Sequence, residues 1–128
     1  MSRGLADTTV FVARESGRAL RVDLLPDVIG VSVITIGELR AGVLAAADVE
    51  TRDRRLSTLT QALALDPILI DGAVAESWAR LRLLLRDSQQ QMPVNDSWIA
   101  ATALALGVPV VTQDDDYVDV PSLAVIKV

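Results

Sequence analysis

The sequence of 128 residues contains no cysteine and no histidine, and only 3% of its residues are aromatic. Without cysteine, the chain cannot form a disulfide scaffold, an iron–sulfur cluster or a thiolate zinc site. Without histidine, it cannot form an imidazole zinc site or a catalytic triad with a histidine base. Any catalytic chemistry of this chain therefore rests on carboxylates, hydroxyl groups or arginine.

Long apolar runs are also missing. No segment approaches the roughly 20 apolar residues that a membrane helix needs, and the opening residues MSRGLADTTV lack the apolar core of a signal peptide. The length suits one domain spanning residues 1–128, because about 100–150 residues is the commonest domain size. We therefore expect a single-domain, cytoplasmic protein that makes no contact with a membrane.

The charge balance is acidic. Twelve basic residues, all arginine except Lys127, stand against 17 acidic residues, which gives a net charge of −5. Such a surface disfavours sequence-independent binding of polyanions. If a polyanion binds here, a divalent cation held by carboxylates would supply the local positive charge, and those carboxylates would contribute to the acidic excess.

Apolar residues alternate between strand-like and helix-like spacing along the whole chain. This pattern favours an α/β fold with a central, mostly parallel sheet of about five strands flanked by helices. Strands are predicted within residues 5–13 (ending near 7–10), 28–33, 68–70, 108–112 and, at the sheet edge, 123–128. Helices are predicted to begin near Thr35, to span 50–65, to follow a cap at Asp71, and to run from Asn95 and Asp96 to a left-handed Gly107.

Acidic residues recur near the predicted carboxyl ends of the strands, where α/β sheets bind their ligands. Asp7 lies inside an apolar run, where a carboxylate is unfavourable unless it is paired or bound to a cation. Glu38 and Asp96 lie in the first turns of two predicted helices, and the run from Asp114 to Asp116 follows the fourth strand. Carboxylates without histidine or cysteine suit Mg²⁺ or Mn²⁺, which can activate a water for attack on a phosphate.

Each acid also has a purely structural interpretation. Glu38 stands at capping-box spacing from a threonine three residues earlier. Asn95 or Asp96 can cap a helix, and the run from Asp114 to Asp116 can be a solvated turn. Asp7 can accept hydrogen bonds from backbone amides. These alternatives remain open from the residues alone.

Four segments in chain order carry a more specific pattern. They are LADTTV at residues 5–10, ITIGELRAG at 34–42, NDSWIAATA at 95–103 and VTQDDDY at 111–117. Together they resemble the motifs of PIN-domain ribonucleases of the VapC type, the toxins of bacterial toxin–antitoxin pairs. The resemblance covers nearly the whole chain.

The resemblance implies a function and a set of site residues. It implies a Mg²⁺-dependent or Mn²⁺-dependent endoribonuclease that hydrolyses RNA phosphodiesters, forms a homodimer and is inhibited by a VapB-type antitoxin lying across it. The implied acidic, metal-holding pocket consists of Asp7, Glu38, Asp96 and Asp114, with Asp116 as a fifth member and Thr112 as a supporting hydroxyl. Three consecutive aspartates leave open which of them faces the metal. Apolar and amphipathic helices of the first half are the predicted dimer surface.

Three alternatives compete with this hypothesis. A non-catalytic interaction module with the same fold would keep the scaffold without the chemistry. A phospho-receiver domain also binds Mg²⁺ with carboxylates, but it needs paired acids in the first strand and a basic residue, usually lysine, at the end of the last strand. Here Asp7 has no acidic neighbour in its strand, and Lys127 lies near the terminus. A phosphatase of the haloacid dehalogenase type would need a second aspartate where Thr9 stands.

Overall fold

The computed structural model describes residues 1–117 and 119–128. Its elements, in order, are β1 (Arg3–Ala6), α1 (Thr8–Glu15), a short 3₁₀ helix η1 (Val22–Leu24), β2 (Val28–Val31), α2 (Val33–Leu44), α3 (Val49–Leu63), α4 (Gly72–Asp87), α5 (Val94–Leu106), β3 (Val110–Thr112) and β4 (Val125–Lys127). The predicted α/β class is therefore confirmed. In the part of the chain described, no helix combines the length and apolarity that crossing a membrane requires.

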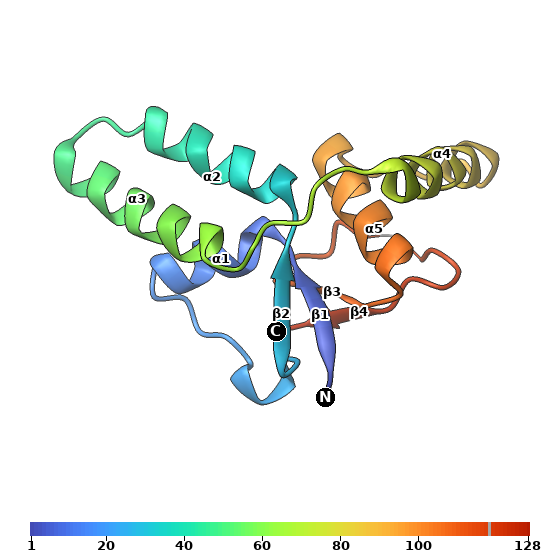
Figure 1. Cartoon of the computed structure of the whole chain (residues 1–128), viewed down its shortest axis with the longest axis horizontal. Helices are drawn as coiled ribbons and strands as arrows, with labels where there is room; N and C mark the ends of the chain where they lie inside the picture. The colour runs from blue at the N-terminus through green and yellow to red at the C-terminus, as the bar shows by residue number, and fades with distance from the viewer. Residues whose placement is uncertain (118) are drawn as a thin grey trace.

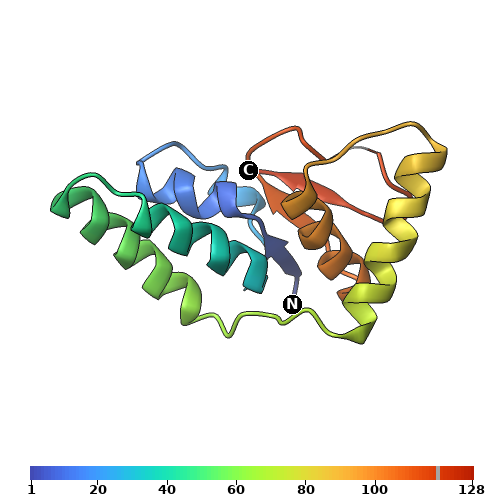
Figure 2. The same ribbon diagram turned by 90° about the horizontal axis from the view of Figure 1, so that it is seen from above.

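The strands form one parallel sheet in the order β2-β1-β3-β4, with β4 at the edge as predicted. Parallel neighbours need crossover connections, which the helices provide here. The α2–α3 pair extends to one side of the molecule and the α4–α5 pair to the other, with the sheet between them (Figures 1 and 2). The carboxyl ends of the central strands β1 and β3 consequently open at the same edge, between the two helix pairs.

Alternate residues of the central strands pack against different helices, because successive side chains of a strand point to opposite faces. Leu5 and Val110 pack with Ile99 of α5. Ala6 and Val111, the next residues of each strand, lie in a second cluster with residues of α1. The sheet is thus buried on both faces, and this burial fixes the register of β1 and β3. The residues that directly follow these two strands are positioned by the same packing.

The first predicted strand is too long. β1 ends at Ala6, and residues 8–13 belong to helix α1. Asp7 caps this helix, since its Oδ1 atom accepts a hydrogen bond from the Thr9 amide at 3.0 Å. The many β-branched residues suggested a strand, but β propensity is a weak and context-dependent preference. The cap and the burial of one helix face against the sheet override it.

The strand predicted at residues 68–70 is shorter than predicted. Among the described residues it is reduced to a single parallel bridge between Ser32 and Ile68. The Ile68 amide donates to the Val31 carbonyl at 2.8 Å, and the Val33 amide donates to the Ile68 carbonyl at 3.0 Å. The chain leaves the sheet after these two bonds because Asp71 already caps α4, accepting from the Val74 amide at 2.9 Å as predicted.

Helix α2 begins earlier than predicted. Its cap is Ser32, whose side chain accepts from the Ile34 amide at 3.0 Å. Thr35 is therefore already inside the helix and fully buried, and Glu38 lies in the second turn. The capping-box interpretation of Glu38 is wrong, and its side chain needs another explanation.

The remaining helices follow the predicted pattern with two exceptions. The spacing of Leu56, Leu59 and Leu63 predicts that they share one apolar face of α3, but only Leu59 is buried, and Leu56 and Leu63 are exposed. Helix α5 ends at Gly107, which adopts a left-handed φ of 68° as predicted, but Pro93 rather than Asn95 or Asp96 occupies its N-cap position. The side chain of Asp96 is therefore available for a role other than capping.

Candidate functional site

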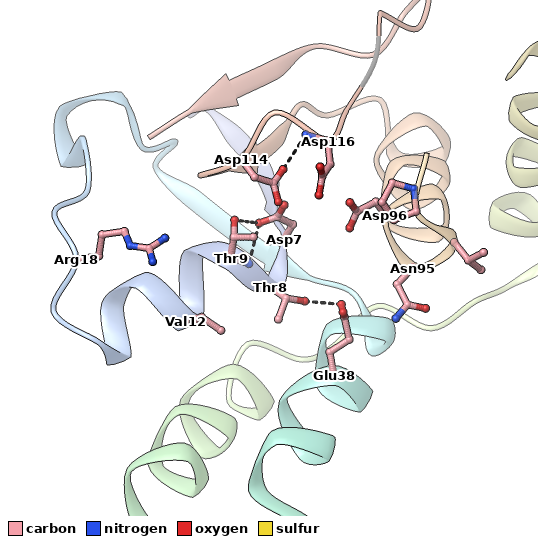
Figure 3. A pocket seen from close by; sticks show the side chains of 12 residues that line it. Asp7, Thr8, Thr9, Val12, Arg18, Glu38, Asn95, Asp96, Asp114 and Asp116 are labelled. Carbon is pink, nitrogen blue, oxygen red and sulfur yellow. Dashed lines mark hydrogen bonds between the residues drawn. The ribbon is translucent and has the colours of Figure 1, made fainter. Parts of the chain in front are cut away.

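A cavity of about 510 Å³ opens where β1 and β3 end, beside the N-terminal parts of α1, α2 and α5 (Figure 3). Its lining residues are Asp7, Thr8, Thr9, Val12, Arg18, Glu38, Pro93, Val94, Asn95, Asp96, Asp114 and Asp116. The structure therefore brings five carboxylates together from four segments that are distant in sequence. The sixth residue singled out from the sequence, Thr112, lies directly behind this cavity as a hydrogen-bond partner of Asp7.

Asp7 is almost completely buried, and both of its carboxylate oxygens have donors. Oδ1 accepts from the amide of Thr9 at 3.0 Å and from its hydroxyl at 2.5 Å, and Oδ2 accepts from the Thr112 hydroxyl at 2.6 Å. Burial raises the pKa of Asp7 above its ordinary value, and the hydrogen bonds oppose but do not cancel this effect. Asp7 is thus a fixed carboxylate whose orientation the protein determines.

The two threonines that hold Asp7 also position the loop after β3. The Thr9 hydroxyl accepts from the Gln113 amide at 2.9 Å, and the Thr112 hydroxyl accepts from the Asp114 amide at 3.1 Å. Asp114 in turn accepts from the Asp116 amide at 3.1 Å, a local bond of the kind that aspartate makes in turns. These bonds set the backbone that carries the last two acids of the pocket.

Asp96, Asp114 and Asp116 form the tightest carboxylate group, which we call the acid trio. One carboxylate oxygen from each lies within 4.8 Å of the others. The pKa of Asp96 is raised to about 7 by burial first, and then by the charges of Asp114, Asp7, Asp116 and Glu38. Within the described residues no hydrogen-bond donor is aimed at the Asp96 carboxylate, so only a proton or a cation can offset its charge.

Glu38 approaches the cavity from the opposite side to Asp114 (Figure 3). Its Oε1 atom accepts from the Thr8 hydroxyl at 2.6 Å, and that hydroxyl also lies 3.0 Å from the Thr35 hydroxyl. Helix α1 therefore positions acids on both sides: Asp7 through its cap and Glu38 through its first residue. This contact explains why an acid sits in the second turn of α2.

The three consecutive aspartates divide between pocket and solvent. Asp114 and Asp116 line the cavity. Asp115 points away, and its carboxylate pairs with Lys127 at 2.6 Å in an exposed ion pair. The solvated-turn interpretation therefore applies to Asp115 alone. Lys127, the one lysine that a phospho-receiver could use, is engaged outside the pocket.

Tyr117 and Arg18 are not among the site residues predicted from the sequence. The Tyr117 hydroxyl is buried and has no hydrogen-bond partner among the described residues. Its pKa is raised by burial and by the nearby charges of Asp7, Asp96 and Asp114. Tyr117 is the last residue of the VTQDDDY segment, so its place in that motif could have marked it as a site residue. Arg18 lies in a loop with no motif around it, so no feature of the sequence marked it.

The donor set fits a hard divalent cation. The described residues that line the cavity offer carboxylate and hydroxyl oxygens and no imidazole nitrogen or thiolate sulfur of the kind that zinc or copper prefers. The acid trio could hold the ion, with Asp7 and Glu38 beside it. The raised pKa of Asp96 is consistent with a site completed by something other than protein.

Comparison with known proteins gives consistent matches along the chain. Residues 5–123 match the family model of the PIN domain. The sequence is 43% identical over 125 residues to ribonuclease VapC5 of Mycobacterium tuberculosis, an alignment that covers 98% of this chain and 93% of the relative. It is 49% identical over 131 residues to ribonuclease VapC4 of the same organism, covering 98% of this chain and 97% of the relative.

Solved structures agree with the sequence matches. A crystal structure of VapBC-5 from Mycobacterium tuberculosis, a member of the VapBC family of toxin–antitoxin systems, superposes with a TM-score of 0.91 at 40% identity, covering all of both chains. VapBC2 from Rickettsia felis, bound to a DNA fragment from its promoter, gives a TM-score of 0.81 at 22% identity and covers 96% of both chains. The second likeness concerns the fold alone.

Proposed function

Because this chain belongs to the PIN domain family, we propose that it is a metal-dependent endoribonuclease that hydrolyses RNA phosphodiester bonds as a VapC-type toxin. The observation that carries the proposal is the convergence of five carboxylates on one cavity, three of them with oxygens within 4.8 Å of one another. Two relatives of nearly equal length are named ribonucleases, which supports the same chemistry. We further propose that residues 1–128 form a single such domain.

The proposed metal is Mg²⁺ or Mn²⁺, held by Asp96, Asp114 and Asp116 with Asp7 and Glu38 beside it. When bound, such a cation supplies positive charge at the phosphate and lowers the pKa of water. The pKa of Asp96 is about 7, so near neutral pH a proton on Asp96 competes with cation binding.

The chain's own residues then supply orientation and proton transfer. Asp7, with both oxygens hydrogen-bonded, keeps one arrangement and cannot rotate away from the acid trio. Glu38 reaches in from the opposite side, and Thr8 holds one of its oxygens, so the other is free to accept a proton from the attacking water. The water oxygen would bond to phosphorus while the bond from phosphorus to the leaving ribose oxygen breaks on the opposite side, and that oxygen would take a proton from solvent, which completes phosphodiester hydrolysis.

The first test is incubation of the purified, antitoxin-free chain with total cellular RNA in Mg²⁺, in Mn²⁺ and in chelator. We expect discrete fragments that require the metal and that disappear in Asp7→Asn. Asp71→Asn is the matched control, because Asp71 also caps a helix with its side chain but lies outside the cavity. Cleavage that persists in chelator or in Asp7→Asn would contradict the proposal.

A non-catalytic interaction module is the second candidate. Its support is that α2 and α3 expose apolar side chains, among them Leu44, Leu56 and Leu63, which is a feature of binding surfaces. If the folded chain cleaves no RNA and a titration detects no binding of Mn²⁺, this candidate replaces the nuclease.

We also propose two protein partners. A VapB-type antitoxin is proposed because the structural relative at 40% identity belongs to a toxin–antitoxin system of the VapBC family. A homodimer is proposed through the exposed apolar residues of α2 and α3, and light scattering at micromolar concentration tests it, with a monomer as the contradicting result. Both partners and the RNA substrate are consistent with the cytoplasm as the site of action.

A further inference from the structure

Arg18 lies on the wall of the acidic cavity, just beyond α1. The chain turns back at Gly17, whose φ of 73° is left-handed, and the Arg18 amide donates to the Ala13 carbonyl at 2.9 Å. This tight turn directs the side chain of Arg18 along α1 toward the cavity, where it is one of the lining residues. Figure 3 shows its guanidinium pointing toward Thr9 and Asp7.

The charge of Arg18 contrasts with its surroundings. It is the one basic side chain among the described residues that line the cavity, and it shares this cavity with five carboxylates. The five ion pairs found among residues 1–117 and 119–128 do not include it. Its exposed guanidinium therefore keeps its hydrogen-bond donors available, although acids lie in the same cavity.

Building on the proposed function, we propose that Arg18 binds a backbone phosphate of the RNA on the α1 side of the cavity. A guanidinium offers two parallel N–H donors that match two phosphate oxygens. With a net charge of −5, the protein gains little from general attraction to RNA, so local cations must position the backbone. Arg18 on one side and the acid trio with its cation on the other would place the strand across the cavity.

The competing interpretation is that Arg18 only offsets the charge of the acids. The two interpretations predict different results for Arg18→Ala. A substrate contact predicts weaker RNA binding with unchanged metal binding. A counter-charge predicts unchanged RNA binding and tighter Mn²⁺ binding, because removing a positive charge from the cavity favours the cation.

The test measures cleavage of a short single-stranded RNA that carries one mapped site, at a series of salt concentrations and saturating metal. We expect Arg18→Ala to lower kcat/KM by about tenfold, mainly through KM, and to reduce the slope of log kcat/KM against log salt by about 0.7, the value for one phosphate contact on a single strand. Arg18→Lys keeps the charge, so it should restore the salt slope while recovering only part of kcat/KM.

Arg21→Ala is the matched control. Arg21 belongs to the same connecting segment and carries the same charge, but it pairs with Asp23 at 3.2 Å and does not line the cavity. We expect its kcat/KM and salt slope to match those of the unmodified chain. Thermal unfolding and a Mn²⁺ titration of Arg18→Ala, both expected to be unchanged, separate a substrate contact from a folding or metal-site defect.

The outcomes distinguish this inference from the proposed function. If the unmodified chain cleaves RNA and Arg18→Ala has the same kcat/KM and salt slope, the inference is wrong and the proposed function stands. If Mn²⁺ binding changes and RNA cleavage does not, Arg18 is a counter-charge. If the unmodified chain cleaves no RNA, the proposed function fails and the inference fails with it.

Discussion

Asp7 and Asp96 line the same cavity, but the protein surrounds them differently. Asp7 belongs to a hydroxyl wall, formed with Thr9 and Thr112, in which every carboxylate oxygen has a hydrogen-bond donor. Asp96 belongs to the acid trio, where its neighbours are other carboxylates and their charges raise its pKa to about 7. The Asp7 carboxylate therefore has hydrogen-bond donors from the protein at both oxygens, whereas the Asp96 carboxylate has none among the described residues.

This difference assigns the two walls different tasks. The hydroxyl wall fixes geometry, because donors from α1 and from the end of β3 hold one carboxylate in place. The acid trio stores unfavourable repulsion that a proton or divalent cation relieves, so it is suited to binding. Both tasks are needed if a cation is to be held at a defined position.

The largest expected effect comes from removing the charge at the centre of the hydroxyl wall. Asp7→Asn should lower RNA cleavage by at least about a hundredfold, because the carboxylate beside the proposed cation is lost. The fold should persist, since asparagine can still accept the hydrogen bond that caps α1. Initial cleavage rates and circular dichroism measure the two effects, and Asp71→Asn should change neither.

The next effect comes from removing one donor of the same wall. Thr112→Val should lower the free energy of unfolding by about 2 kcal/mol, because the buried Asp7 carboxylate loses its 2.6 Å hydrogen bond. Chemical denaturation measures the change, and Thr112→Ser should largely restore stability.

The matched control is Thr60→Val, which removes an exposed hydroxyl whose one bond within the described residues is to the Leu56 carbonyl of its own helix. Its effect should stay within about 0.5 kcal/mol, the usual range for surface substitutions. Equal effects at positions 60 and 112 would contradict the special role of the hydroxyl wall.

If the acid trio binds the metal, the affinity for the metal should depend on pH. Because the pKa of Asp96 is about 7, a proton competes with the cation below that pH. Mn²⁺ affinity should therefore rise by up to about tenfold per pH unit below pH 7 and level off above it. Calorimetric titrations between pH 5.5 and about 8.5 test this, and a flat profile would show that Asp96 does not contribute.

The smallest effect concerns the stability of the protein without metal. The raised pKa of Asp96 means that the folded chain holds a proton that the unfolded chain releases between about pH 4 and 7. Stability therefore falls as pH rises through this window, and Asp96→Asn, which does not titrate, should gain most near pH 8. We expect about 1 kcal/mol, reduced from the full linkage value because the side chain is partly exposed to water.

The measurement is chemical denaturation in chelator at pH 8 and again near pH 4.5, where the gain should shrink. Asp53→Asn, which removes the same charge from an exposed position on α3, should not stabilise the chain in this way. A gain that is independent of pH would mean that the substitution acts by packing rather than by relieving repulsion.

Much of the architecture could be predicted from local pattern. The sequence signals for the α/β class, the cap at Asp71 and the left-handed Gly107 depend on a few neighbouring residues, and all three are confirmed. The errors occur where tertiary contacts overrule local preference. Residues 8–13 have the composition of a strand, but they form a helix because Asp7 caps them and the sheet buries one of their faces.

For the candidate site, too, the sequence predicted part of the result: which residues belong to it, but not what surrounds each of them. The acids Asp7, Glu38 and Asp96 could be selected because carboxylates near strand ends of an α/β sheet suggest a shared cavity. Their environments could not be predicted, since the bond from Thr112 to Asp7 joins residues 105 positions apart. The outward turn of Asp115 and the placement of Arg18 likewise depend on loops without a local signal.

The sequence by itself therefore determined which chemical groups are available and roughly which elements carry them. Spacing, caps and apolar period act over a few residues, so they can be recognised without coordinates. Only the tertiary structure decided which carboxylates receive hydrogen-bond donors and which face one another. That decision depends on distances between segments far apart in the chain, and these distances are set by how β1, β3, α1 and α5 pack together.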